Sequence, residues 1–174
     1  MARWRSSAGT PFISLVAVPS LRKKTRKSCC AASWPDPRRE SPVQVTNACD
    51  AARAGCGAPL PHPDPWTCAL RAGRTLCRRL REELPEADAG VGVSGGVAVA
   101  GNVGAAHRFE YTVIGDPVNE AARLTEIAKT VDARVLASEA LLSRAVEEER
   151  SRWKLSAEVE LRGRDAPTRV WVPT

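Results

Sequence analysis

The sequence predicts an α+β fold in which an antiparallel sheet is flanked by helices. A β-branched run at Phe109–Ile114 leads directly into helix-forming residues that begin at Pro117. Apolar residues at helical spacing predict a helix over Trp66–Leu84. Near the end of the chain, Ala157–Arg162 and Thr168–Val172 are typical of two strands joined by a turn.

The remaining elements fit between these. Ala89–Ala100 is rich in valine and small residues and predicts a strand, in which the glycines allow another backbone to approach closely. Ala133–Ala137 predicts a further strand. Ser138 is placed to cap a short helix that runs to about Ala145. Glu147–Arg150 is expected to be a charged stretch on the surface.

The sharpest local signal is the turn Gly115-Asp116-Pro117. Asp116 is expected to be the N-cap of the following helix, and Pro117 its first residue, where the missing N–H has no partner to lose. Asn119 and Arg123 are four residues apart and therefore share one face of that helix. An amide and a guanidinium near a helix N-terminus suit an anionic phosphate ester.

A simpler alternative is open for the same residues. The helix is amphipathic, and Arg123 could pair with Glu120 or Glu126 on its own surface.

A longer ordered pattern surrounds this turn. The residues are G-V-S-G-G-V-A-V-A-G-N-V-G at Gly92–Gly104 and R-F-E-Y-T-V-I-G-D-P-V-N-E-A-A-R-L at Arg108–Leu124. The stretch Val91–Leu124 resembles the C-terminal half of a class III nucleotidyl cyclase domain of the adenylate/guanylate cyclase family, with a bacterial adenylate cyclase-like character. The likeness extends more weakly from about residue 57 to the end of the chain. It implies part of a ferredoxin-like domain.

The resemblance also implies roles for single residues. Asn119 matches the asparagine that orients the ribose, and Arg123 matches the arginine that stabilises charge on the phosphate as the 3′-hydroxyl attacks. Thr112 falls where the family reads the purine, and a threonine there favours ATP; its alternative is an ordinary β-branched strand residue. Arg164 is the nearest match to a cation that contacts the phosphates, and a solvent-exposed turn arginine explains it equally well.

In this family two aspartates hold two divalent ions, Mg²⁺ or Mn²⁺. The first aspartate motif, of the type F-x-D-I-x-G-F-T, has no counterpart in this sequence. Asp50 lies about where the second aspartate would fall, but its surroundings, N-A-C-D-A-A-R-A-G-C, do not resemble the family's hairpin. Asp50 is therefore either a metal ligand, a remnant of one or a chance aspartate. The chain's own metal site is expected to be missing.

Composition divides the chain near residue 57. Residues 1–56 hold 10 Lys/Arg and 3 Asp/Glu, whereas residues 57–174 hold 16 and 17. The first part mixes Arg, Ser, Pro, Cys and Trp without a helical or strand period and predicts a low-order basic segment. One hypothesis is that it is a degraded or frame-shifted remnant of the missing cyclase half. The second part is the expected cyclase-like portion.

The formal charge of +6 comes from the first segment, and no nucleic-acid motif accompanies it, so nucleic acid is not an expected partner. The six cysteines show no CxxC pair or zinc spacing, which favours a cytoplasmic chain with reduced thiols. No apolar run reaches the roughly 20 residues of a membrane span.

These expectations converge on a domain fragment related to enzymes that convert ATP to cyclic AMP and pyrophosphate. It keeps the Asn/Arg side of the catalytic site, lacks the metal-binding half and is expected to be inactive alone. ATP, a homodimer or a heterodimer with an intact class III cyclase are the expected partners, because family members build each active site from two chains. The alternative is a non-catalytic dimerisation module that modulates an intact cyclase. Loss of the early strands is expected to leave an unpaired sheet edge.

Overall fold

The computed structural model describes residues 11–20, 44–48, 51–56, 62–105, 108–162 and 166–174. The strands are β1 (Pro11–Ser20), β2 (Gln44–Ala48), β3 (Ala51–Cys56), β4 (Asp88–Val97), β5 (Val99–Ala105), β6 (Arg108–Ile114), β7 (Val135–Ser138), β8 (Trp153–Val159) and β9 (Thr168–Pro173). The helices are α2 (Pro65–Glu83), α3 (Asp116–Ala128), α4 (Glu139–Leu142) and α5 (Glu147–Arg150).

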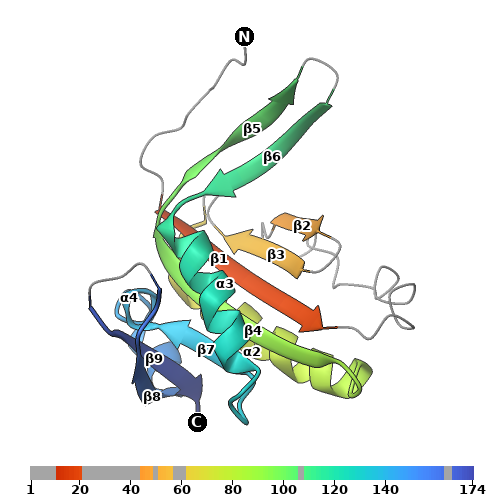
Figure 1. Cartoon of the computed structure of the whole chain (residues 1–174). Helices are drawn as coiled ribbons and strands as arrows, with labels where there is room; N and C mark the ends of the chain where they lie inside the picture. Colours follow the sequence, from red (N-terminus) through yellow and green to blue (C-terminus); the bar gives the residue numbers. More distant parts are fainter. Residues whose placement is uncertain (1–10, 21–43, 49–50, 57–61, 106–107, 163–165) are drawn as a thin grey trace.

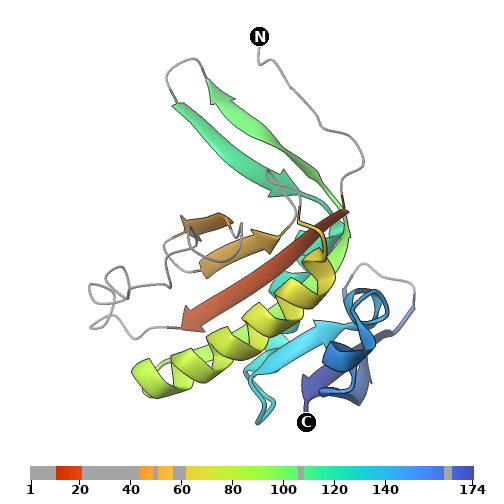
Figure 2. The ribbon, with the colours of Figure 1, turned by 180° about the vertical axis from the view of Figure 1, so that it is seen from behind.

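Seven of the strands form one sheet in the order β2-β3-β1-β4-β7-β9-β8, and β5 pairs with β6 in a separate hairpin. Helix α3 crosses one face of the large sheet, and α2 lies on the other (Figures 1 and 2). The predicted α+β fold with flanking helices is confirmed. The sheet is mixed, however, because β4 and β7 are parallel, with Val91 opposite Val135.

The expectation of little regular structure before residue 57 is wrong for three stretches. β1 runs antiparallel to β4 over its whole length, from Pro11 opposite Val97 to Ser20 opposite Asp88. β3 pairs with β1, and β2 pairs with β3. Loss of the early strands was expected to leave an unpaired sheet edge, but β1 pairs with β4 from within this segment. The division at residue 57 and the frame-shift hypothesis stay predictions.

The long helix α2 follows the pattern predicted for it. It starts one residue earlier than expected, because the Asp64 carboxylate accepts a hydrogen bond from the backbone N–H of Thr67 at 3.1 Å and caps the first turn. Leu70 and Cys77 of the predicted apolar stripe are buried against the sheet. The helix ends before Pro85, which cannot continue it.

Strand β4 presents different side chains to its two faces. Val91 and Val93 are 1% and 0% exposed and belong to the cluster under α2, whereas Gly90 and Gly92 face α3. A Cβ added at Gly92 would lie 2.1 Å from the backbone oxygen of Ala121. The glycines therefore allow α3 to rest directly on the strand backbone. The predicted strand over 89–100 is divided at Ala98, where the chain leaves the large sheet.

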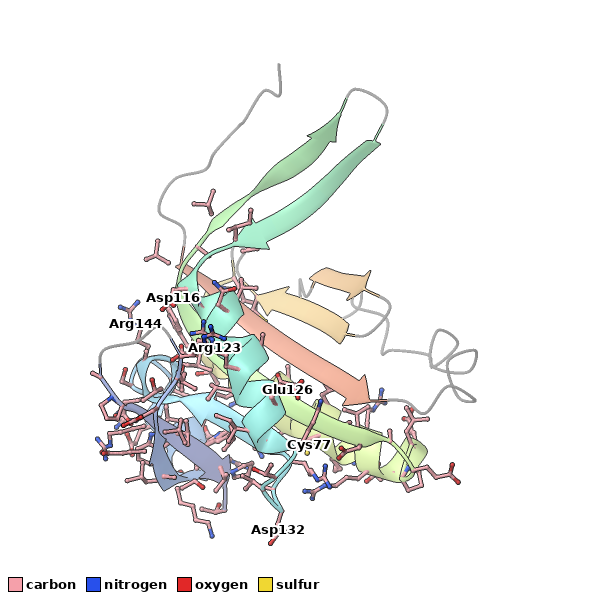
Figure 3. All side chains as sticks on the ribbon, in the orientation of Figure 1. Cys77, Asp116, Arg123, Glu126, Asp132 and Arg144 are labelled. Atoms are coloured by element: carbon pink, nitrogen blue, oxygen red, sulfur yellow. The ribbon has the colours of Figure 1, made fainter. Side chains whose placement is uncertain are left out.

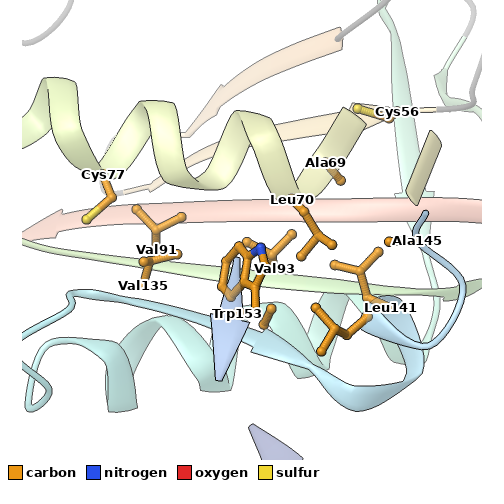
Figure 4. Close-up of a cluster of buried hydrophobic side chains, with 12 residues drawn as sticks. Cys56, Ala69, Leu70, Cys77, Val91, Val93, Val135, Leu141, Ala145 and Trp153 are labelled. Atoms are coloured by element: carbon orange, nitrogen blue, oxygen red, sulfur yellow. The ribbon is translucent and has the colours of Figure 1, made fainter. Parts of the chain in front are cut away.

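The core beneath α2 joins residues that are far apart in the sequence. Figure 4 shows Leu70 of α2, Val91 and Val93 of β4, Leu141 of α4 and Trp153 of β8 converging between the helix and the sheet. A second, smaller cluster lies on the other face of the sheet. It consists of Leu124, Ala128, Leu136, Leu161, Val170 and Val172. Burial of both faces fixes the sheet between its helices.

The C-terminal part departs from the sequence expectations at α5 and at the start of β8, and the short helix α4 ends at Leu142 instead of near Ala145. Glu147–Arg150 is the short helix α5, and its Glu149 side chain is only 1% exposed. The Glu149 carboxylate accepts hydrogen bonds from Arg74 at 2.8 Å and from the Trp153 indole at 3.2 Å. β8 also begins at Trp153, ahead of the predicted strand, although the hairpin with β9 forms as expected. Glu149 thus fastens α2 to α5 and β8.

Candidate functional site

The turn between β6 and α3 positions the candidate site. Asp116 was expected to be the N-cap, but the structure has Gly115 there, and α3 begins at Asp116 without a side-chain cap. Pro117 consequently occupies the second helical position instead of the first. A Cβ added at Gly115 would lie 2.9 Å from the Ala98 side chain, so the helix start is packed against the base of the β5–β6 hairpin.

Helix α3 has one buried face and one face that is open to solvent. Ala121, Leu124 and Ala128 are fully buried, whereas Asn119 is exposed and Arg123 is half-buried. Figure 3 shows Arg123 near the N-terminal end of α3, in the same region as Asp116. Asn119 and Arg123 therefore share a face that a ligand or a second protein can reach.

The alternative in which Arg123 pairs with a neighbouring glutamate is not seen. Glu126 forms an ion pair with Lys129 at 2.9 Å. Glu120 points inward and accepts a hydrogen bond from the Ser94 hydroxyl on β4. Within the described ranges, the Arg123 guanidinium and the Asn119 amide make no side-chain hydrogen bond or ion pair. Their hydrogen-bonding groups are available for an external partner.

Glu120 is a buried contact between α3 and β4 that the sequence did not reveal. Its side chain is buried, at 2% exposure, between α3 and β4. The hydrogen bond with Ser94 fixes the rotation of α3 about its axis, and thereby the outward direction of its neighbour Asn119. A glutamate in a helix is usually solvated, and only the small residues of β4 hinted that a side chain had to fit there.

For the other predicted site residues the structure gives less information. Thr112 lies on β6, opposite Gly101 of β5. Asp50 and Arg164 lie outside the described residues. The structure therefore brings Asn119 and Arg123 together on one helix, and their relation to Thr112, Asp50 and Arg164 stays a prediction.

The strands that enter the sheet from the N-terminal segment carry no acidic residue: β1 reads PFISLVAVPS, β2 QVTNA and β3 AARAGC. In the described part of the chain, no group of three or more His, Cys, Asp or Glu side chains could hold a metal ion. The donor chemistry of these strands does not fit a pair of divalent cations, which prefer carboxylate oxygens.

The β5–β6 hairpin projects away from the large sheet (Figures 1 and 2). At its base the side chains of Val97 and Ile114 are 67% and 58% exposed, the two highest values among the exposed large apolar residues of the described chain. This apolar surface lies next to the start of α3. No helix in the described ranges has both the length and the apolar character to cross a membrane.

Solved structures identify the class of this fold. The guanylyl cyclase Cya2 is 20% identical, with a TM-score of 0.73 over 95% of this chain and 93% of that one. The adenylyl cyclase CyaB from P. aeruginosa is 16% identical, with a TM-score of 0.74 over 98% of this chain and 96% of that one. The molecule has the fold of a nucleotidyl cyclase domain, and the likeness extends over the N-terminal strands.

Sequence comparison gives the family. Residues 77–174 match the adenylate and guanylate cyclase catalytic domain, and the chain belongs to that family. The resemblance stated from the motifs is thus confirmed. Uncharacterized protein Rv1319c of Mycobacterium tuberculosis is 54% identical over 125 residues, and uncharacterized protein Rv1318c of the same organism is 52% identical over 124. These matches cover 72% and 71% of this chain, which spans only 23% of either relative.

Proposed function

We propose that this chain supplies one side of a cyclase active site, with Asn119 and Arg123 as the residues that meet the nucleotide. The observation that carries the proposal is their placement on one outward face of α3, without a partner among the described residues. An arginine held this way, on a helix fixed to the sheet backbone, is preorganised to interact with an anion.

The proposed reaction is an internal displacement in ATP. The ribose 3′-oxygen forms a bond to the α-phosphorus and loses its proton, while the bond to the bridging oxygen breaks and pyrophosphate leaves. Asn119 would hold the ribose so that the hydroxyl is in line with the leaving group. Arg123 would stabilise the negative charge on the phosphate oxygens in the transition state, a contribution of about 3–4 kcal/mol for a well-placed group.

The described strands of the N-terminal segment do not provide the acidic side of this site. β1, β2 and β3 offer no carboxylate for the Mg²⁺ or Mn²⁺ on which the family depends. We therefore infer that a lone chain, or a homodimer of it, is inactive, and that an intact class III cyclase supplies the metal-binding carboxylates in a heterodimer. The exposed Val97 and Ile114 beside α3 are the surface that this second cyclase chain would cover.

Two finer points belong to the same proposal. Thr112 favours ATP over GTP, so cyclic AMP is the expected product. If the chain instead only modulates another cyclase as a dimerisation module, Asn119 and Arg123 would be dispensable.

The test is complementation. An intact class III cyclase whose own Asn/Arg pair has been replaced by alanine keeps its metal-binding carboxylates but cannot complete a site. We expect neither protein alone to turn over ATP in the presence of Mn²⁺, and a mixture of the two to form cyclic AMP. Arg123→Ala should lower the activity of the mixture by about 10²–10³-fold.

Glu126→Ala is the matched control, because Glu126 lies on the same helix and pairs only with Lys129 in the described structure. This variant should retain the activity of the mixture. Co-elution of the two proteins without cyclic AMP formation would favour the dimerisation module. Turnover by the lone chain that is abolished by Arg123→Ala would show that it possesses its own metal site, and would overturn the proposal.

A further inference from the structure

Two cysteines from different elements lie side by side at the edge of the core. Cys56 is the last residue of β3, and Cys68 lies in the first turn of α2. Their sulfur atoms are 3.5 Å apart, and the Cys56 thiol donates a hydrogen bond to the Cys68 sulfur. Figure 4 shows Cys56 and Cys77 towards opposite ends of the view. The two sulfurs are in van der Waals contact without a covalent bond.

The two thiols have unequal surroundings. Cys56 is 4% exposed, and its hydrogen bond to Cys68, together with burial, raises the pKa of its thiol well above the ordinary range. Cys56 therefore stays protonated and donates. Cys68 is half-buried and so more accessible than Cys56, accepts that hydrogen bond and lies near the N-terminus of α2, where the helix dipole favours negative charge on sulfur. An oxidant from solvent reaches Cys68 first.

We propose that Cys56 and Cys68 are a reversible disulfide site whose oxidant is hydrogen peroxide. The sulfur of Cys68 attacks one peroxide oxygen, the O–O bond breaks, and a sulfenic acid and one water form. The sulfur of Cys56 then attacks the Cys68 sulfur, the S–O bond breaks, and the hydroxyl group leaves with the Cys56 proton as a second water. Two electrons pass from the two sulfurs to the peroxide, and a thiol reductant reverses the step.

The third described cysteine, Cys77, differs from this pair because its partner is a carbonyl group instead of a thiol. Cys77 is also buried on α2, but its thiol donates to the backbone oxygen of Ala133 at 3.2 Å. A sulfenic acid at Cys77 would meet a carbonyl group there, whereas one at Cys68 meets a thiol. Cys77 is therefore a control of the same chemistry on the same helix.

The bond would tie the N-terminal strands to α2. Ile13 of β1 is opposite Cys56 of β3, and β1 pairs along the whole of β4. A covalent link between Cys56 and Cys68 fastens this edge of the sheet to the helix that covers it. We expect the midpoint of thermal unfolding to rise by roughly 5–10 °C on oxidation.

Trypsin separates the cysteines for the test. It cuts after Arg53 and Arg71, so Cys56 and Cys68 fall in one peptide, 54–71, while Cys77 falls in 75–78 and Cys49 in 40–53. The full chain is treated with hydrogen peroxide, alkylated with iodoacetamide, digested and analysed by mass spectrometry. We expect peptide 54–71 to lose two hydrogen atoms and to escape alkylation, and dithiothreitol to restore both thiols. Peptide 75–78 should stay alkylated.

Three variants complete the experiment. Cys56→Ser and Cys68→Ser should each abolish the mass change and the rise in unfolding temperature, and Cys77→Ser should keep both. A peptide 54–71 that remains doubly alkylated after peroxide treatment would overturn the proposal. So would a bond from either cysteine to Cys49 or to any other peptide. The digest of the wild-type protein is sufficient to show whether the disulfide forms. The proposal is therefore testable even if a serine variant fails to fold.

Discussion

The two faces of β4 are packed in opposite ways. Towards α2 the strand presents Val91 and Val93, and the space between is filled by large side chains such as Leu70. Towards α3 it presents Gly90 and Gly92, and the helix backbone itself closes the gap. One helix is held by interlocking side chains, and the other is held by contact between two backbones.

The difference determines how accurately each helix is placed. Side chains in a core can change rotamer when a neighbour changes, so α2 has some freedom to adjust. Backbone atoms cannot move aside in this way, and α3 is further fixed by the hydrogen bond between Ser94 and Glu120. The helix that carries Asn119 and Arg123 is the one whose position the sheet dictates directly, as a preorganised site requires.

The largest effect is expected from Gly92→Val. Even the first added carbon would lie 2.1 Å from the Ala121 oxygen and 2.6 Å from the Thr125 nitrogen, and neither backbone atom can rotate away. We expect a loss of roughly 3 kcal/mol or more in the free energy of unfolding, measured by urea denaturation. The neighbouring Val93→Ala, on the other face, is the control and should cost less. Equal losses would show that the glycine face is no tighter than the valine face.

A smaller effect is expected from Leu70→Ala. Leu70 is 0% exposed, and its removal leaves a cavity under α2 that should cost about 3 kcal/mol of unfolding free energy. Since α2 lies on the other face from α3, the complementing activity of the folded variant should remain within about twofold of the wild type. A variant that unfolds at the expected urea concentration but fails to complement would contradict the independence of the two faces.

The smallest effect concerns Cys77. Burial raises the pKa of its thiol above the ordinary value of 9.0, although Arg81 and Arg134 oppose the rise. Because the folded pKa is the higher one, this contribution to stability is complete below about pH 9 and is lost as the pH rises towards the folded value. Between pH 7 and pH 10 the wild type should lose more unfolding free energy than Cys77→Ala, by less than about 1 kcal/mol. Equal losses of unfolding free energy in the wild type and in Cys77→Ala would show that ionisation of the Cys77 thiol does not contribute to this pH dependence.

Much of the fold could be predicted because its signals are local. The apolar stripe lies within α2 and Pro85 follows it directly, and these local signals place the helix to within one residue. The turn before α3 was also recognised, but its cap was misplaced by one position. The extended Gly115 packs against Ala98, and this distant contact, which no local rule includes, selects where the helix starts.

The features that were missed depend on distant partners. β1 has no amphipathic alternation, and it becomes a strand because β4 and β3 pair with it on both sides. Glu149 lies in a run of charges that is typical of a surface, yet Arg74, which is 75 positions earlier, meets its carboxylate. For the candidate site, the spacing of Asn119 and Arg123 was sufficient to predict a shared face. The inward turn of Glu120 was not predictable, because it depends on Ser94.

The backbone contact between α3 and β4 also limits how such a domain can diversify. Every replacement of Gly92 adds atoms where none fit. The strand residues that contact the α3 backbone can therefore vary little. New preferences for one nucleotide over another, or for one partner over another, must then arise in the hairpin and in the connecting segments around a fixed helix.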